Sequence, residues 1–504
     1  MFHFRNRTTF LIIFLGIFLL SSEARSLTPG KEELRILNIH SSPQKGDIWS
    51  VNFQTQGKSD LKIIPQDQAT IEDDEFSGLY CGQKKVDPQI LKDDIIFYPG
   101  WQCDEIARVE HYTRKQGNHI LQFVFNKEIR HAYNAAYDIA VLNSLEHDTI
   151  DGDYNSLVMI DATHFILAYR GETGDGFIST FSIDPSTYAI TELNTLEHDT
   201  SNGSWSSLIK IDDTHFMVAY SGTDFDGYIS TFSIDGSYAI TELNTLEYDT
   251  DITQTTSLVM IDATHFILAY AGTDNDGFIK TFSIDGSYAI TEINSLEHDI
   301  ANGTWCSLVK IDATHFILAY ATSGNDGQIT TFSIDGSYNI TEINSIEHDL
   351  LNGTYNSLVM IDATHFILAY TGDASDGYLA TFSIDGSYNI TELNSLEHDT
   401  TNAIWNSLIM LDATHFIVAY TGTSSYGYIK TFSIDGSYAI TEVNSLEHYS
   451  SILTVYTAHS LVKINSTRLI LAFADVDNDG ILRTFSVASA RTPLKGAVIF
   501  IKSH

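Results

Sequence analysis

Closely spaced carboxylates are the sharpest chemical signal in this 504-residue chain. Asp475, Asp477 and Asp479 occupy alternate positions directly before Gly480. Oxygen ligands at the first, third and fifth positions of a loop, followed by glycine at the sixth, are what a Ca²⁺ loop requires. We therefore take calcium as the candidate cofactor and these three aspartates as its candidate ligands.

The loop DVDNDG at 475–480 resembles the calcium loops in the FG-GAP repeats of integrin α-subunit propellers. The resemblance implies a Ca²⁺-binding turn at this point. The carboxylate usual at the ninth position of such a loop is Arg483 here, and the partial copies GTDFDG and GTDNDG have fewer aspartates. The alternative is that all of these segments are simple Asp-Gly turns.

A Glu-His-Asp triplet recurs along the chain at 146–148, 197–199, 297–299, 347–349 and 397–399. Imidazole and carboxylate groups are metal ligands. Successive residues of a strand point to opposite faces of a sheet, however, so one triplet cannot converge on one ion. We expect a structural role for the triplets, and the same for the histidine of the recurring segment DATH beside a tight turn.

An aromatic residue recurs at the start of another repeated segment. The set consists of Tyr154, Trp205, Trp305, Tyr355 and Trp405, with Thr255 interrupting it and Tyr456 displaced. Aromatic faces around one opening can stack on sugar rings or apolar side chains. We predict that these residues bind a ligand, together with Arg170, the one cation unique to its loop position. The alternative is that the rings wedge between neighbouring structural units.

The elements that position these residues follow from internal repetition. The segment SLVMIDATHFILAY recurs, and its histidine marks a period of about 50 residues from His164 to His415, with Arg468 in the seventh copy. Each copy contains four apolar or alternating runs of strand length separated by turn signals, and none has a helical period. Four antiparallel strands repeated seven times predict an all-β, seven-bladed β-propeller.

The turns predict how each blade is arranged. The two tight turns lie on one face and the two longer connections lie on the other, so the run SLVMI is expected innermost and AITELNSLEHD outermost. With this order of strands, residues 139–148 form an outermost strand that completes the last blade, beside the strand Ile481–Val487. That pairing leaves no open edge in the ring. The alternative occupant of this edge is the tail.

Four segments are predicted. Residues 1–26 have two arginines before an apolar run, which is typical of a secretory signal. Residues 27–138 read as a small β-sandwich, 139–487 as the propeller, and 488–504 as a tail with one possible extra strand. In an oxidising compartment we expect a disulfide between Cys81 and Cys103, which leaves Cys306 free as a tolerated substitution.

The charge is concentrated in one segment. The chain has a formal net charge of −38, and residues 139–487 alone carry −39. Such a surface repels nucleic acid, so we expect a glycan or protein ligand instead. No stretch after the signal approaches the roughly 20 apolar residues of a membrane span. We expect a monomer that is secreted or held at the cell surface in the extracellular space.

Within the repeats the framework is constant and the long loops vary, which is typical of a scaffold that presents a binding surface. The sequence therefore predicts an exported, non-catalytic binding or adhesion protein. One alternative is a glycan-active hydrolase, but near-identical blades offer no pair of carboxylates in unequal environments. The ring also lacks the arginine cluster and the Asp-box of sialidases. The other alternative is a purely structural surface protein.

Overall fold

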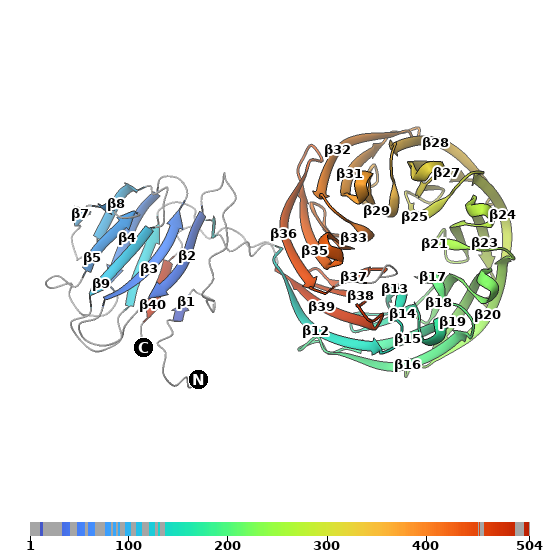
Figure 1. The fold of residues 1–504 in the computed structure, drawn as a ribbon, viewed down its shortest axis with the longest axis horizontal. Coiled ribbons are helices and arrows are strands. Elements are labelled where there is room, and N and C mark those ends of the chain that lie inside the picture. The colour runs from blue at the N-terminus through green and yellow to red at the C-terminus, as the bar shows by residue number, and fades with distance from the viewer. Residues whose placement is uncertain are drawn as a thin grey trace. The chain divides into compact units, whose positions relative to one another are not determined.

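The computed structural model divides the chain into two compact units, Met1–Ala136 with Ala490–His504, and Tyr137–Ser489 (Figure 1). It describes residues 137–451, 453 and 458–488 together with their side chains. Elsewhere it describes only the backbone of the strands named below.

The first unit contains two six-stranded sheets, with strand orders β1-β40-β10-β4-β8-β7 and β11-β2-β3-β9-β5-β6. The strands are β1 (Leu11–Ile13), β2 (Glu33–His40), β3 (Ile48–Thr55), β4 (Ser59–Pro65), β5 (Phe76–Cys81), β6 (Lys84–Val86), β7 (Gln89–Ile90), β8 (Ile96–Trp101), β9 (Ala107–Tyr112), β10 (Ile120–Phe125), β11 (Arg130–His131) and β40 (Val498–Lys502). This is the strand content expected of a β-sandwich. The side chains of Cys81 and Cys103 lie outside the described residues, so their disulfide stays a prediction.

The second unit is a seven-bladed propeller of four-stranded antiparallel sheets, as predicted (Figure 1). The innermost strands are β13 (Asp153–Met159), β17 (Ser204–Lys210), β21 (Gln254–Met260), β25 (Thr304–Lys310), β29 (Thr354–Asp362), β33 (Ile404–Asp412) and β37 (Ser460–Asn465). The second strands are β14 (His164–Arg170), β18 (His215–Ser221), β22 (His265–Ala271), β26 (His315–Ala321), β30 (His365–Thr371), β34 (His415–Thr421) and β38 (Arg468–Ala474). We number the blades 1 to 7 in this order.

The outer half of each blade follows the same repetition. The third strands are β15 (Gly176–Ile183), β19 (Gly227–Ile234), β23 (Gly277–Ile284), β27 (Gly327–Ile334), β31 (Gly377–Ile384), β35 (Gly427–Ile434) and β39 (Gly480–Val487). The outermost strands are β16 (Ile190–Asp199), β20 (Ile240–Asp249), β24 (Ile290–Asp299), β28 (Ile340–Asp349), β32 (Ile390–Asp399), β36 (Ile440–Tyr449) and β12 (Ile139–Asp148). Short 3₁₀ turns precede six of the third strands: η1 (Glu172–Gly174), η2 (Thr223–Phe225), η3 (Thr273–Asn275), η4 (Ser323–Asn325), η5 (Asp373–Ser375) and η6 (Thr423–Ser425).

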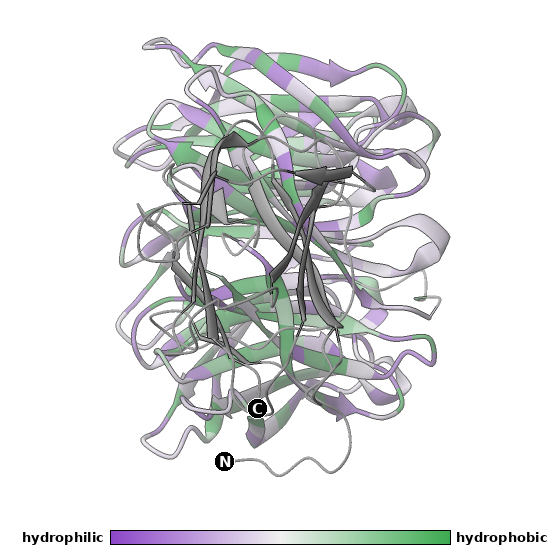
Figure 2. Ribbon diagram, turned by 90° about the vertical axis from the view of Figure 1, so that its left-hand side faces the viewer, coloured by the Kyte–Doolittle hydropathy of each residue, from purple (hydrophilic) through white to green (hydrophobic). Residues whose placement is uncertain are grey.

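The burial of each strand explains its composition. The second strands are apolar throughout because neighbouring blades cover both of their faces, and Phe165, Ile166, Leu167 and Ala168 of β14 have no exposed surface. The outermost strands alternate, because one face packs on the blade and the other faces solvent. Figure 2 shows hydrophobic and hydrophilic residues alternating along the propeller strands. The core therefore lies between the blades.

The ring is closed by strands from distant parts of the sequence. β12 pairs antiparallel with β39, from Ile139 opposite Val487 to Asp148 opposite Gly480. This confirms the predicted closure. β40 of the tail pairs instead with β10 of the first unit. The alternative in which the tail completes the last blade is therefore wrong.

A ring of hydrogen bonds around the channel ties each blade to the next. Each innermost strand contains a Ser-Leu pair. Its serine hydroxyl accepts a hydrogen bond from the backbone N–H of the leucine in the next blade, with N···Oγ distances of 2.9 Å from Leu208 to Ser156 and 3.1 Å from Leu408 to Ser357. The bond from Leu157 to Ser460, at 2.9 Å, joins the last blade to the first. The other four are Leu258 to Ser207, Leu308 to Ser257, Leu358 to Ser307 and Leu461 to Ser407. The repeated SL pair is thus explained by inter-blade bonding.

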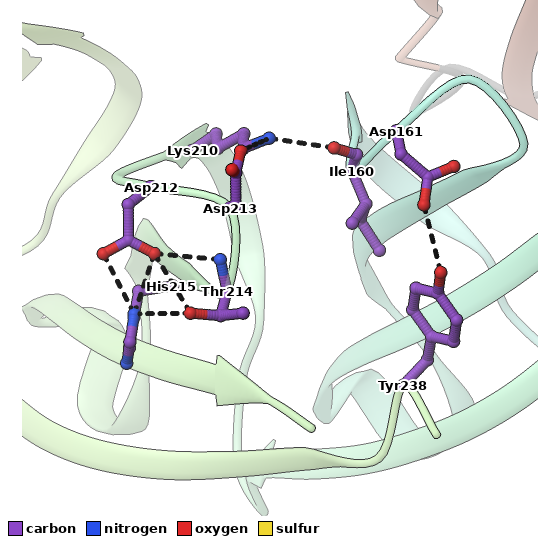
Figure 3. Close-up of polar contacts among 8 residues, drawn as sticks. All are labelled: Ile160, Asp161, Lys210, Asp212, Asp213, Thr214, His215 and Tyr238. Carbon is purple, nitrogen blue, oxygen red and sulfur yellow. Dashed lines mark hydrogen bonds and ion pairs between the residues drawn. The ribbon is translucent and has the colours of Figure 1, made fainter. Parts of the chain in front are cut away.

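The tight turns between the first and second strands join neighbouring blades, and Figure 3 shows the contact between Asp161 and Tyr238. The Asp161 carboxylate contacts His164 Nδ1 at 2.9 Å and accepts a hydrogen bond from the Tyr238 hydroxyl of blade 2 at 3.0 Å. The Tyr238 ring stacks on His164 with centroids 3.9 Å apart. Partial burial alone would raise the pKa of Asp161, but hydrogen bonds from Thr163, His164 and Tyr238 outweigh it and lower that pKa to about 2.

The same Asp-His-Tyr contact recurs at the next blades. In blade 6 the partner of His415 and Asp412 is Tyr137, two residues before the start of β12. In blade 7, Arg468 stands in place of the histidine and lies over the Tyr188 ring at 4.7 Å. The DATH histidines therefore have the turn-capping and packing role expected for them.

Candidate ligand-binding site in the central channel

A β-bulge at the entry of the innermost strands sets the direction of the repeated aromatic residue. In β13, Asp153 pairs with Arg170, but the next pair is Ser156 with Ala168, so β13 contains one extra residue. The same irregularity occurs in β17, β21, β25, β29 and β33. The residue after the first pair has a φ of 50° to 59° in each case: Tyr154, Trp205, Thr255, Trp305, Tyr355 and Trp405.

This backbone conformation favours glycine or asparagine, and it strains a bulky or β-branched residue by an energy of order 1 kcal/mol. Thr255 shows that the bulge forms without an aromatic ring. The framework therefore requires the left-handed backbone but not tryptophan or tyrosine. The aromatic residues at the other five positions are best explained by what their rings do in the channel.

The five rings meet one another across the channel. Ring centroids lie 5.5 Å apart for Trp205 and Trp305, 5.6 Å for Trp205 and Trp405, and 5.4 Å for Trp305 and Trp405, although these residues come from blades 2, 4 and 6. Tyr154 contacts Trp205 at 4.7 Å, and Tyr355 contacts Trp305 at 3.8 Å. The structure thus brings together all five aromatic residues that the sequence singled out. Contacts between non-adjacent blades show that the rings occupy the channel and are not wedges between neighbouring blades.

A cavity of about 200 Å³ lies in the channel against these rings. Its lining has two tiers. The aromatic tier consists of Tyr154, Trp205, Thr255, Trp305, Tyr355, Trp405 and Ala458. The polar tier consists of the residue that follows each of these along the chain: Asn155, Ser206, Thr256, Cys306, Asn356, Asn406 and His459. None of these lining residues is Asp, Glu, Lys or Arg, so the described cavity wall has no charged acid–base pair.

The polar tier is anchored to the backbone through its donors. Asn155 Nδ2 donates to the Gly152 carbonyl at 2.8 Å, and Asn356 Nδ2 donates to the Gly353 carbonyl at 2.8 Å. Asn406 Nδ2 donates to the carbonyls of Tyr355 at 3.2 Å and Ala403 at 3.3 Å. Because a carbonyl can only accept, these bonds fix which end of each amide is the oxygen.

The opposite ends of these amides are acceptors without a partner. The Oδ1 atoms of Asn155, Asn356 and Asn406 are buried and have no hydrogen-bond partner among the described residues. Asn155 is 6% exposed and Asn406 is 9% exposed. An unsatisfied buried acceptor costs about 1–3 kcal/mol. Three such groups around one cavity indicate a place where a donor group is expected.

Cys306 belongs to the polar tier and is a free cysteine, as predicted. Its Sγ donates to the Gly303 carbonyl at 3.1 Å. Burial raises the pKa of this thiol to about 12, so it is not a thiolate at neutral pH. The residue fills the place that asparagine occupies in blades 5 and 6, which supports its interpretation as a tolerated substitution.

Arg170 lies outside the cavity lining. Its guanidinium contacts Asp153 at 3.1 Å and Asp151 at 3.6 Å. Asp153 is 1% exposed, and burial together with Asp151 raises its pKa to about 7 despite the adjacent arginine. The structure therefore places Arg170 in an ion pair of its own blade and not among the channel aromatics.

The loop at Asp475 is held by its own backbone. Asp475 Oδ1 accepts hydrogen bonds from the N–H groups of Asp477 at 2.9 Å and Asp479 at 3.1 Å, and Oδ2 accepts one from the Tyr449 hydroxyl at 3.0 Å. No group of three or more His, Cys, Asp or Glu side chains in the described part of the chain fits a metal ion. Calcium at Asp475, Asp477 and Asp479 stays a prediction.

The long-loop face carries a feature that the sequence analysis missed. Large apolar side chains are exposed at the tips of the loops between blades, with Ile300 80% and Leu350 72% exposed. The others are Ile150, Ile252 and Leu351, and Phe225 and Val476 are exposed in the second loops. An apolar residue inside a polar loop was the signal that could have found them. Tyr456 lies outside the described residues.

Comparison with known proteins identifies no family. No family model matches the chain, and no curated protein matches it. Among the residues that the structure describes, no helix is long and apolar enough to cross a membrane.

Three solved structures share features of the fold at low sequence identity. A protein described as a 6-phosphogluconolactonase from Bacteroides fragilis NCTC 9343 is 16% identical over 65% of this chain and 90% of its own, with a TM-score of 0.49. The periplasmic gluconolactonase of Pseudomonas aeruginosa is 13% identical over 57% of this chain and 84% of its own, with a TM-score of 0.46. Chaetomium thermophilum Sqt1, bound to the N-terminus of ribosomal protein L10, is 13% identical over 64% of this chain and 81% of its own, with a TM-score of 0.43. Likenesses at this level transfer no activity to this chain.

Proposed function

We propose that this chain is an exported, non-catalytic binding or adhesion protein that captures a glycan or protein ligand at the mouth of its central channel. One observation carries the proposal. Three tryptophans and two tyrosines are held in a strained backbone conformation against a cavity that also has polar lining residues, at a position where Thr255 shows that the bulge forms without an aromatic residue. The predicted signal segment supports export to the extracellular space.

The surroundings of the cavity support binding over catalysis. The loops around the mouth vary between copies while the strands do not, and their tips expose apolar side chains such as Ile300 and Leu350. Glycoside hydrolysis requires two carboxyl groups at the scissile bond, and the described cavity lining contains none.

The test compares the wild type with Trp205→Thr, Trp305→Thr and Trp405→Thr, singly and as a triple variant, on an array of glycans and peptides. Threonine is chosen because blade 3 already has it at this position. The control is Leu393→Thr on the exposed outermost strand β32. We expect each tryptophan substitution to weaken binding by about 1–2 kcal/mol, with little change in melting temperature.

Two outcomes would contradict the proposal. If the triple variant melts many degrees lower while its folded fraction binds as well as the wild type, the rings serve packing alone. If the wild type turns over a bound glycan, the protein is a hydrolase. Leu393→Thr should leave both binding and stability unchanged.

A further inference from the structure

We propose that the chemical group bound in the channel cavity is a protonated alkylamine, either a free amine or a lysine side chain. This inference rests on the proposed function and specifies the chemistry of its ligand. It follows from the hydrogen-bonding character of the polar tier, the arrangement of the tryptophans and the charge of the propeller.

The amides of the polar tier offer acceptors to a ligand and keep their donors engaged. The Nδ2 groups of Asn155, Asn356 and Asn406 are bound to backbone carbonyls, while their Oδ1 atoms are buried without a partner. Ser206 and Cys306 likewise direct their hydrogens to backbone carbonyls, of Gly203 and Gly303. A sugar hydroxyl both donates and accepts, whereas an ammonium only donates. The polar tier therefore suits an ammonium better than a sugar.

The three tryptophans bring their rings within reach of a single cation. The centroids of Trp205, Trp305 and Trp405 form a nearly equilateral triangle with sides of 5.4 to 5.6 Å. A cation about 4–5 Å from the plane of these centroids lies within about 6 Å of all three, the distance range in which a cation over the face of a ring is attracted to it. The Trp305 ring is inclined by 75° to the Trp205 and Trp405 rings, so the three faces point in different directions around the cavity. A neutral alkyl group at the same place gains only the apolar contact.

Charge favours the same ligand. Residues 139–487 carry a formal −39, which attracts cations to the propeller and repels anions. No lysine or arginine lines the described cavity, and the one titratable group of the polar tier besides Cys306 is His459. An alkylamine that reaches the Oδ1 atoms also relieves the cost of burying them without a donor.

The experiment titrates four probes against the full chain by calorimetry and by tryptophan fluorescence. Butylammonium and Nα-acetyl-lysine N-methylamide carry the proposed group and represent the free amine and the lysine side chain. Nα-acetyl-norleucine N-methylamide is the neutral control with the same alkyl chain, and methyl glucoside represents a sugar. We expect the two amines to bind at least tenfold more tightly than the neutral probes, and a preference between the two amines to identify the source.

Matched variants test the acceptors. Asn406→Ser and Asn155→Ser keep a hydroxyl that can donate to the backbone, as Ser206 does in blade 2, but remove the unpaired carbonyl. We expect each to weaken binding of butylammonium by about tenfold. Ser206→Asn adds a fourth acceptor and should strengthen binding severalfold.

The outcomes separate this inference from the proposed function. If the norleucine derivative or the glucoside binds as tightly as the amines, or if the Asn→Ser variants bind butylammonium as the wild type does, the amine assignment is wrong. If no probe binds while the array identifies a ligand that depends on the tryptophans, the amine assignment falls and the proposed function stands. If neither experiment detects binding, both fall.

Discussion

Mild acid should unfold this propeller, because a set of histidines is buried in neutral form. These are the histidines of the Glu-His-Asp triplets and their equivalent in blade 6: His147, His198, His298, His348, His398 and His448. Both ring nitrogens of each are buried without a hydrogen-bond partner among the described residues. The His348 ring, for example, meets Tyr370 edge-on at 4.6 Å and lies so close to Gly327 that a methyl group there would clash.

Burial lowers the pKa of these groups, to about 3 for His147, His348 and His398 and about 4 for His198 and His298. Burial lowers the pKa of His448 as well. The unfolded chain takes up protons near pH 6.5 while the folded chain does not, so the free energy of unfolding falls as pH falls from about 6.5 toward 4. The slope is about 1.4 kcal/mol per pH unit for each histidine.

From pH 7 to pH 5 each histidine therefore removes about 2 kcal/mol from the free energy of unfolding. Six together remove about 12 kcal/mol, which is comparable to the whole stability of a typical domain. The aspartates of the tight turns change the free energy of unfolding in a lower pH range. Their lowered pKa values, such as about 2 for Asp161, give stability that is present above about pH 4 and is lost only as pH falls below it.

The assay is guanidinium unfolding at pH 7 and pH 5 for the wild type, His348→Tyr and Tyr248→His. Blade 2 already has tyrosine at this position, where Tyr248 meets Tyr270 edge-on at 4.9 Å, so His348→Tyr has a structural precedent. We expect it to reduce the loss of stability between the two pH values by about 2 kcal/mol, and Tyr248→His to increase that loss by a similar amount. The opposite contribution of Asp153, whose pKa burial raises to about 7, is common to all three proteins and cancels. Equal pH dependence in the three proteins would refute the reasoning.

Three further outcomes are expected. Deletion of residues 139–148 should lower the melting temperature of the whole propeller in one cooperative transition, because it exposes the edge of β39; a small separate transition in calorimetry would contradict this. Thiol counting in denaturant without reductant should find one free thiol, from Cys306, and three would show that Cys81 and Cys103 are not bonded. In a glycosylating host, mass spectrometry should find glycans at the exposed Asn339, Asn389 and Asn465. It should find none at the other three sequons, Asn202, Asn302 and Asn352, whose Nδ2 groups donate to backbone carbonyls, and a glycan at Asn202 would overturn this assignment.

The sequence by itself determined the architecture. A period of about 50 residues, alternating strands and two kinds of turn are local patterns, and only a ring of seven blades satisfies all of them. The order of strands within the repeats also predicted that 139–148 pairs with Ile481–Val487, because the seventh repeat lacks an outermost strand of its own and the pairing closes the ring. The five channel aromatics were found by comparing copies of one segment.

Only the tertiary structure decided where side chains point and what they bind. A single left-handed residue at the bulge turns Trp205, Trp305 and Trp405 toward one another, and nothing in the residue type tryptophan indicates that backbone conformation. The unpaired amide oxygens of the polar tier depend on which carbonyls lie within reach of Nδ2. The sequence offered Arg170 as a ligand-binding residue and Asp475 as a calcium ligand. In the structure Arg170 forms an ion pair with Asp153, and Asp475 accepts a hydrogen bond from the backbone N–H of Asp477. Such local contacts depend on which groups the fold brings close together.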